Sequence, residues 1–137
     1  RYFWEGTCNI PWLDPATVCV LEGPPERIGE NERSVLRFVY QLPSETRQRL
    51  GKFIFDNYQQ DIYGSMAGGD RVTPPVADPS DIWPLLSKPG VAISENPEPN
   101  HYFAVSFECV WDPEHGLSIL FNDLGDPIDM GGQGDHF

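Results

Sequence analysis

The sequence predicts an α+β fold: an antiparallel sheet with a C-terminal three-stranded meander, and one long and one short helix packed on one face. Three observations support this fold class. Apolar and polar residues alternate as in strands near both ends of the chain, an apolar stripe with helical spacing lies in the middle, and turns rich in Pro and Gly separate these segments. A chain of 137 residues suits one domain, so we expect a single α+β domain over residues 1–137.

The N-terminal part begins with two predicted strands. Residues 2–12 are rich in β-forming side chains and end near Pro11, and residues 17–21 form a second β-rich run. Residues 22–31 hold Gly and Pro among charged side chains, so we expect a loop there.

Residues 34–42 alternate once more between two sides of an extended chain. Leu36, Phe38 and Tyr40 fall on one side, and their neighbours fall on the other. The segment is interpreted as a strand, with a helix as the alternative.

One long helix is predicted to begin at Ser44 and to end near residue 63. Ser44 is a favourable N-cap, and Gly64 can supply the C-terminal cap. Gly51 lies inside the helix, where glycine costs about 1 kcal/mol relative to alanine. We therefore expect it to allow a close approach of the helix to the sheet. The apolar stripe repeats every four residues, at Leu50, Ile54, Tyr58 and Ile62.

A short second helix is predicted over residues 80–86. Asp78 followed by Pro79 is typical of an N-cap and a first helical position. The neighbouring segments are expected to be a loop at 67–77, a short strand at 91–93 and a stiff acidic connector at 95–100.

The C-terminal part predicts the three-stranded meander. Residues 103–111 and 117–121 both alternate with a period of two, and the Pro- and Gly-containing stretch 112–116 between them predicts a tight polar turn. A second turn at 122–125 leads into a third strand at 127–131. Two strands alone are marginal in water, so the meander needs a layer that packs against it.

The charge distribution restricts the function. The net charge is −12, from 9 basic and 21 acidic residues, and no Lys or Arg follows Lys88. Nucleic acids and anionic membranes attract positive charge, so we expect neither as a partner. A basic protein fits the acidic C-terminal third, because opposite charges steer association. Solubility alone is the alternative explanation of the charge.

The three cysteines number too few for a disulfide scaffold. Cys8, Cys19 and Cys109 form no CxxC pair, which favours a reduced cytoplasmic protein. A single disulfide between Cys8 and Cys19 is the alternative. No apolar run has the length of a transmembrane helix. The chain begins at Arg1, so the removal of an upstream signal peptide is a further alternative.

A family resemblance is carried by residues 111–117, which read Trp-Asp-Pro-Glu-His-Gly-Leu. This stretch is similar to the C-terminal W-D-x-E-H-G-L signature of a bacterial family of uncharacterised α+β domains, and the similarity is closest over residues 103–135. Asp126, Pro127 and the tail at 131–137 depart from the family pattern. Related families include members suspected of being immunity proteins against secreted toxins. The resemblance therefore implies an immunity-like binding role, and it supplies no catalytic residue.

The turn also offers candidate metal ligands. Asp112, Glu114 and His115, with His101 or His136, combine the oxygen and imidazole groups that divalent ions accept. The spacing matches no established metal motif, so a structural turn is the favoured interpretation and no cofactor is expected. A divalent metal, bound structurally or at a hydrolytic site, is the alternative.

The sequence favours binding over catalysis. It contains no nucleophile elbow, phosphate loop or second catalytic motif, and Cys109 falls on the apolar face of its predicted strand. We therefore expect a non-enzymatic domain that binds a basic protein through its acidic C-terminal surface. The candidate binding residues are Trp111, Asp112, Glu114, His115 and Asp123.

Overall fold

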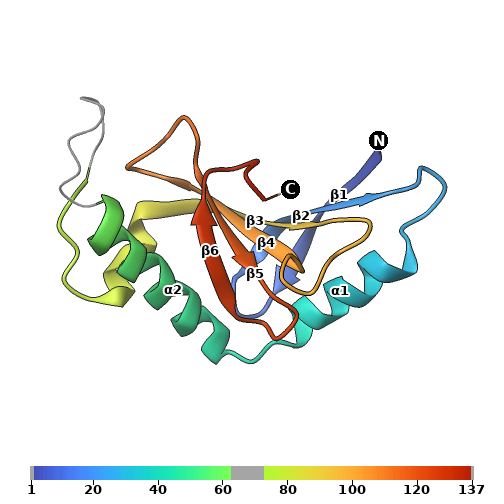
Figure 1. Ribbon diagram of the computed structural model, residues 1–137, viewed down its shortest axis with the longest axis horizontal. Helices are drawn as coiled ribbons and strands as arrows, with labels where there is room; N and C mark the ends of the chain where they lie inside the picture. Colours follow the sequence, from blue (N-terminus) through green and yellow to red (C-terminus); the bar gives the residue numbers. More distant parts are fainter. Residues whose placement is uncertain (1, 63–72, 137) are drawn as a thin grey trace.

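The computed structural model describes residues 2–62 and 73–136. Six strands form one sheet, and the helices lie against one face of it (Figure 1), so the α+β fold class is confirmed. The strands are β1 (Tyr2–Ile10), β2 (Asp14–Gly23), β3 (Leu86–Ile93), β4 (Phe103–Cys109), β5 (Leu117–Phe121) and β6 (Pro127–Gly131). The helices are α1 (Glu30–Gln41), α2 (Glu45–Asn57), the π-helical turn η1 (Tyr58–Ile62) and the 3-10 helix η2 (Pro79–Leu85).

The strands lie in the sheet in chain order, β1 to β6. Every neighbouring pair is antiparallel except β2 and β3, which pair in parallel from Val18↔Gly90 to Leu21↔Ile93. The prediction of an antiparallel sheet is therefore wrong for this pair. Parallel neighbours need a crossover connection, and the segment that contains both α-helices and η2 supplies it.

The predicted C-terminal meander is matched in part. Strands β4, β5 and β6 pair with one another in sequence, as expected. The antiparallel run is longer than predicted, however, because β3 also pairs with β4 and extends from Leu86 rather than from residue 91. The ladder between β3 and β4 is irregular between Ser87 and Gly90, where Lys88 has a positive φ of 52°.

The strand predicted at residues 34–42 is wrong, because this segment belongs to helix α1. Val35 and Val39, one helical turn apart, are buried against the sheet. The apolar residues of this stretch fit a period of two as well as one of 3.6, and contacts with β2 and β3 decide between them. Within the described residues, α1 is thus an additional α-helix beside the predicted long helix and the predicted short one.

The predicted long helix is confirmed as α2 up to Asn57 and continues as the π-helical turn η1, so its apolar stripe spans both elements. Leu50, Ile54 and Tyr58 are fully buried. Ser44 occupies the N-cap position, but its backbone is already helical and its side chain makes no capping hydrogen bond. The proposed cap at Gly64 and most of the loop predicted at 67–77 lie outside the described residues.

Gly51 makes room for a tryptophan rather than for the sheet. A Cβ atom at this position would lie 2.9 Å from Nε1 of Trp83, which projects from η2. The close approach expected between α2 and the sheet is therefore an approach between α2 and η2. The predicted start of this second helix is confirmed, since Asp78 accepts a hydrogen bond from the Ser80 N–H and Pro79 follows it.

The two edges of the sheet differ in exposure. Strand β1 has nine residues, and its Tyr2 and Phe3 side chains are each 58% exposed. Strand β6 has five residues and carries Pro127 and Asp129, which discourage pairing with a further strand. The open edge of the sheet is therefore β1.

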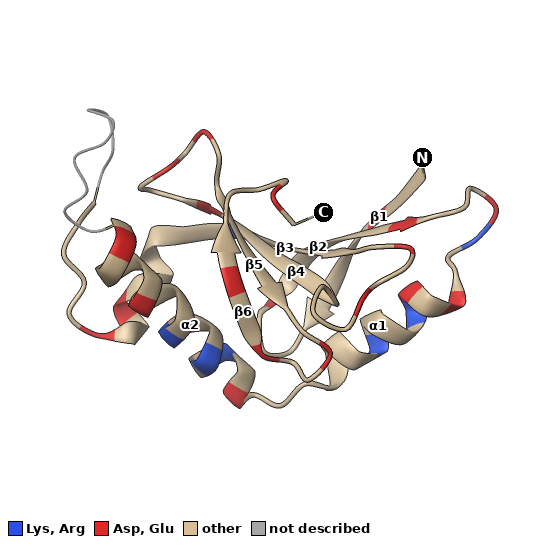
Figure 2. Cartoon of the chain, in the orientation of Figure 1, with Lys and Arg blue, Asp and Glu red and all other residues tan. Residues whose placement is uncertain are grey.

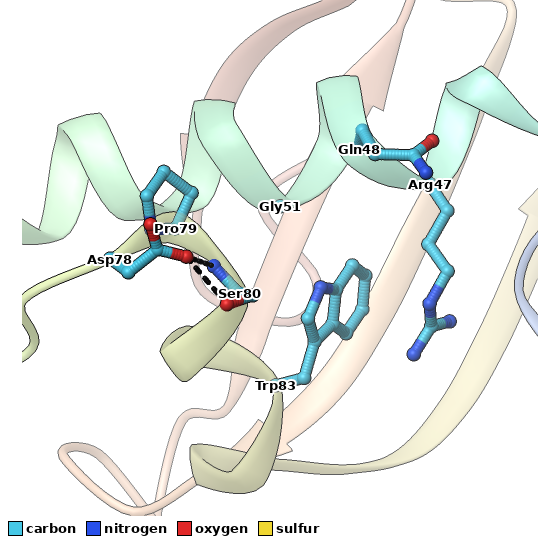
Figure 3. A pocket seen from close by; sticks show the side chains of 7 residues that line it. All are labelled: Arg47, Gln48, Gly51, Asp78, Pro79, Ser80 and Trp83. Atoms are coloured by element: carbon cyan, nitrogen blue, oxygen red, sulfur yellow. Dashed lines mark hydrogen bonds between the residues drawn. The ribbon is translucent and has the colours of Figure 1, made fainter.

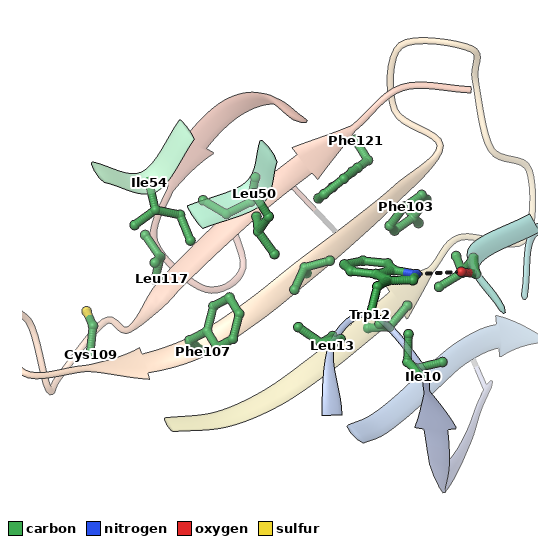
Figure 4. Close-up of a cluster of buried hydrophobic side chains, with 14 of the residues drawn as sticks. Ile10, Trp12, Leu13, Leu50, Ile54, Phe103, Phe107, Cys109, Leu117 and Phe121 are labelled. Atoms are coloured by element: carbon green, nitrogen blue, oxygen red, sulfur yellow. Dashed lines mark hydrogen bonds between the residues drawn. The ribbon is translucent and has the colours of Figure 1, made fainter. Parts of the chain in front are cut away.

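Trp12 connects the N-terminal hairpin, helix α1 and the C-terminal strands (Figure 4). Its indole N–H donates to the backbone oxygen of Val39 over 2.7 Å. Its ring lies 5.9 Å from that of Phe121, which stacks on Phe103 at 4.6 Å. A single buried side chain thus joins three segments that are distant in the sequence.

We expect Trp12→Phe to lower the free energy of unfolding by about 2–4 kcal/mol, because it removes a buried hydrogen bond and leaves a cavity. Urea denaturation measures the loss. Trp4→Phe is the matched control, since the Trp4 indole also donates to a backbone oxygen, that of Pro24 at 3.0 Å, but the ring is only half-buried. Equal losses in the two variants would contradict the central role of Trp12.

Candidate functional site

The turn between β4 and β5 is built around Asp112. Its Oδ1 accepts a hydrogen bond from the backbone N–H of His115 at 3.2 Å and lies 3.1 Å from Nδ1 of the same histidine. Gly116 closes the turn with φ of 68° and donates its N–H to the Asp112 backbone oxygen. Such local contacts are typical of a turn whose role is structural.

The C-terminal segment, residues 132–136, holds this turn from one side. Gln133 donates its backbone N–H to the oxygen of His115 and its side-chain amide to the oxygen of Phe107, both at 2.9 Å. A Cβ atom at Gly116 would lie 2.8 Å from the Gln133 side chain. The turn therefore has a fixed shape, and glycine is required at its last position.

The five candidate binding residues do not form one cluster. Trp111 is 3% exposed and packs on Tyr58, with the ring centroids 4.8 Å apart, so its ring lies in the core. Glu114 and His115 are exposed, and Asp112 is partly exposed. Asp123 lies in the turn that follows β5, about 16 Å away along that strand.

The structure adds an acidic residue that the sequence did not indicate. A cavity of about 230 Å³ at the base of the turn is lined by Asp61 of η1 and by Asp112. The two residues are distant in the sequence, and the packing of α2 and η1 beside the hairpin brings them to one cavity. Two carboxylates here suit a basic side chain or another cation.

The proposed metal ligands are not brought together. No three His, Cys, Asp or Glu side chains among residues 2–62 and 73–136 are grouped so that they could hold a metal ion. His101 precedes Tyr102, whose N–H donates to the backbone oxygen of Phe121, so it lies at the end of β5 away from the turn. His136 uses both ring nitrogens elsewhere, on Ser118 and Asp129.

Ser118, His136 and Asp129 form a hydrogen-bonded chain that sequence analysis missed. Nδ1 of His136 lies 2.8 Å from the Ser118 hydroxyl, and Nε2 lies 2.8 Å from the Asp129 carboxylate. Serine proteases use the same three residue types, but with the opposite nitrogen facing the serine. Ser118 is 4% exposed and the His136 side chain 5%, so the array fastens the C-terminal segment to the sheet rather than presenting a nucleophile.

The C-terminal third carries acidic residues and no Lys or Arg after Lys88 (Figure 2), and ion pairs neutralise only part of this charge. Glu108 pairs with Lys88 at 3.0 Å and Asp126 pairs with Arg49 at 2.6 Å, while Asp112 and Asp129 face histidines. Within the described part of the chain, the other five acidic residues after Lys88 have no basic partner: Glu95, Glu98, Glu114, Asp123 and Asp135. The surface therefore keeps a local excess of negative charge.

The three cysteines are free thiols. Cys8 and Cys19 lie on the neighbouring strands β1 and β2. They do not form the disulfide that the sequence analysis gave as the alternative. The pKa of the Cys19 thiol is raised well above its ordinary value. Burial is the larger cause, and a hydrogen bond with Cys8 is the smaller one. Cys109 is buried, as its position on the apolar strand face predicts.

The fold and the site together define an α+β domain with a mixed six-stranded sheet and an exposed acidic turn. The chain belongs to the family described as Domain of unknown function (DUF6985), whose model matches residues 1–137. The expectation that the chain is a member of a family of uncharacterised domains is thereby confirmed, over the whole chain rather than its C-terminal part. No curated protein and no solved structure matches the chain. None of the helices in the described residues has the length and apolar character that crossing a membrane requires.

We expect His136→Ala to lower the free energy of unfolding by about 1–3 kcal/mol, because the buried hydroxyl of Ser118 loses its partner. Hydrogen exchange of the amides of residues 132–135 should accelerate at the same time. His101→Ala, at an exposed position, is the control and should change stability by less than about 0.5 kcal/mol. A His136→Ala variant as stable as the control would show that the array does not fasten the segment.

Thiol reactivity should follow burial. In the folded protein at mildly alkaline pH, Cys8 should react with Ellman's reagent much faster than Cys19, whose raised pKa keeps it protonated. Cys8→Ser should remove most of the rapid reaction, and all thiols should react after unfolding in urea. Rapid labelling of Cys19 in the folded protein would contradict this order.

Proposed function

We propose that the chain is a non-enzymatic binding domain whose partner is a basic protein, contacted through the tip surface, defined here as Asp61, Asp112, Glu114 and His115. The observation that carries the proposal is that Asp61 and Asp112 line one cavity and that Glu114 is exposed in the adjoining turn. None of these three acidic residues has a Lys or Arg partner among the described residues. Such a surface steers a basic partner into contact and fixes its orientation.

The rigidity of the turn supports a binding role. The Asp112–His115 contacts and the Gln133 hydrogen bonds hold the backbone in place before any partner arrives. A surface that is already ordered loses less conformational entropy on binding. Basic side chains of a partner would insert between Asp61 and Asp112, where Trp111 forms part of the apolar floor.

The similarity of residues 111–117 to a bacterial signature with immunity-like relatives suggests the class of partner. On this proposal the domain neutralises a secreted toxin by covering a basic surface on it. Tight inhibitors of this kind combine charge steering with a buried centre, and the cavity at the base of the turn is the candidate centre.

Charge reversal tests which acidic surface is used. The immobilised protein is exposed to lysate of its source at low and at high salt, the stoichiometrically retained basic protein is identified by mass spectrometry, and its Kd is then measured by calorimetry. Glu114→Lys and Asp61→Lys should each raise the Kd by about tenfold or more, roughly 1.4 kcal/mol, because a cation then opposes the basic partner.

Asp123→Lys is the matched control, since it makes the same change in net charge at the far end of β5. It should change the Kd by less than about threefold, through the general loss of negative charge. If Asp123→Lys weakens binding as much as Glu114→Lys, the tip surface is not the interface. If the retained protein is unaffected by salt, the electrostatic basis of the proposal is wrong.

A further inference from the structure

Arg47 is a basic side chain without a carboxylate partner in a strongly acidic protein. Arg37, Arg49, Lys52 and Lys88 each pair with an acidic residue. Arg47 has no such ion pair among the described residues, although it is half-buried. Its Nη1 donates to the backbone oxygen of Leu13 at 2.8 Å, and its guanidinium lies 4.0 Å from the centre of the Trp83 ring.

These two contacts orient the guanidinium and leave one edge available. Stacking on Trp83 fixes its plane, and the hydrogen bond from Nη1 fixes its rotation. Nε and Nη2 have no acceptor within the described residues. Parallel N–H groups on this edge are the donors with which arginine binds a carboxylate in a bidentate manner.

The neighbouring cavity has the size of a small-molecule site. It has a volume of about 390 Å³ and lies between α2 and η2, with Arg47 at one end, Trp83 in the middle and Asp78 at the other end (Figure 3). Ligand cavities in proteins begin at about 300 Å³. A second cavity of about 190 Å³ also borders Arg47 and Trp83, so this pair separates two open spaces.

The walls of the larger cavity are held in place by the fold. Gly51 lets the Trp83 ring lie against α2, because any Cβ there would meet the indole, and Phe107 supports the ring edge-on at 6.0 Å. The Asp78 cap and Pro79 fix the start of η2. An apolar surface is thus presented beside a cation without a rearrangement.

We propose that this cavity binds a small molecule that carries a single carboxylate on a flat apolar body. The carboxylate lies against the Nε–Nη2 edge of Arg47, and the apolar body covers Trp83 and reaches toward Pro79. Charge complementarity selects the anion, since Arg47 is the basic residue of this cavity.

Asp78 restricts the ligand to one negative charge. The side chain and backbone N–H of Ser80 hydrogen-bond to its carboxylate, which lowers the pKa of Asp78 and keeps it ionised. A second carboxylate at the far end of the ligand would meet this charge. Monocarboxylates should therefore bind better than dicarboxylates of the same width.

Three probes of similar shape test the proposal: phenylacetate, its neutral analogue phenylacetamide, and the dianion 1,4-phenylenediacetate. Each is titrated into the folded protein at constant ionic strength and neutral pH. The readout is the NMR signal of the Trp83 indole N–H, assigned from its loss in Trp83→Phe. Phenylacetate should give a saturable shift with a Kd on the order of 1 mM, and both other probes should bind about tenfold or more weakly.

Variants assign the effect to Arg47. Arg47→Gln should weaken phenylacetate binding by about tenfold, and Arg47→Lys should recover only part of it, because lysine lacks the planar fork. Arg49→Gln, which makes the same charge change on the same helix, should leave the Kd unchanged. If Arg47→Gln fails to fold, the comparison of phenylacetate with phenylacetamide on the unaltered protein decides alone.

Three outcomes would overturn the proposal. One is the absence of a saturable shift at Trp83 with phenylacetate. Another is equal affinity for phenylacetate and phenylacetamide, which would mean that Arg47 does not select an anion. The third is an equal loss of affinity in Arg49→Gln and Arg47→Gln, which would assign the effect to the overall charge.

Discussion

The parallel pairing of β2 with β3 is the constraint on which the rest of this structure depends. Two parallel neighbours cannot be joined by a hairpin, so the chain must leave the sheet after Gly23 and return at Leu86. Both α-helices and η2 lie in this crossover, and all three pack on the same face. The crossover thereby creates the contact between Arg47 of α2 and Trp83 of η2.

The same constraint separates the two candidate sites. Arg47 and Trp83 belong to the crossover, whereas the tip surface is built mainly from the hairpin β4–β5, with Asp61 added from the end of α2 and η1. One site offers a fixed cation beside an aromatic ring, and the other offers carboxylates around a rigid turn. Among the described residues, the two cavities share no lining residue, and Arg47 borders one while Asp61 and Asp112 border the other.

Local patterns in the sequence were sufficient for the elements that are stabilised locally. The β4–β5 hairpin follows from strict alternation around a Pro- and Gly-containing turn, and α2 follows from the spacing of Leu50, Ile54 and Tyr58. Helix α1 was interpreted as a strand, with a helix as the alternative, because its dense apolar residues fit two periods and only packing on the sheet decides between them. The parallel pair was missed because nothing local specifies which strands become neighbours.

The candidate sites show the same limit. Asp112 and His115 are close in sequence, and their contact was foreseeable from the turn. The hydrogen-bonded array Ser118–His136–Asp129 depends on the register of β5 with β6 and on the fold of the last residues. No local sequence motif therefore predicts it. Trp111 was named as a candidate binding residue, yet the alternation of residues 103–111 already placed it on the apolar face, and it is 3% exposed.

The unequal edges of the sheet limit how copies of this protein can associate. Strand β1 is long, carries one charge and exposes Tyr2 and Phe3, while β6 is short and begins at Pro127. A further strand can therefore be added only beside β1. Two copies that met in this way would each use their single open edge, which gives a closed two-fold pair rather than a growing filament.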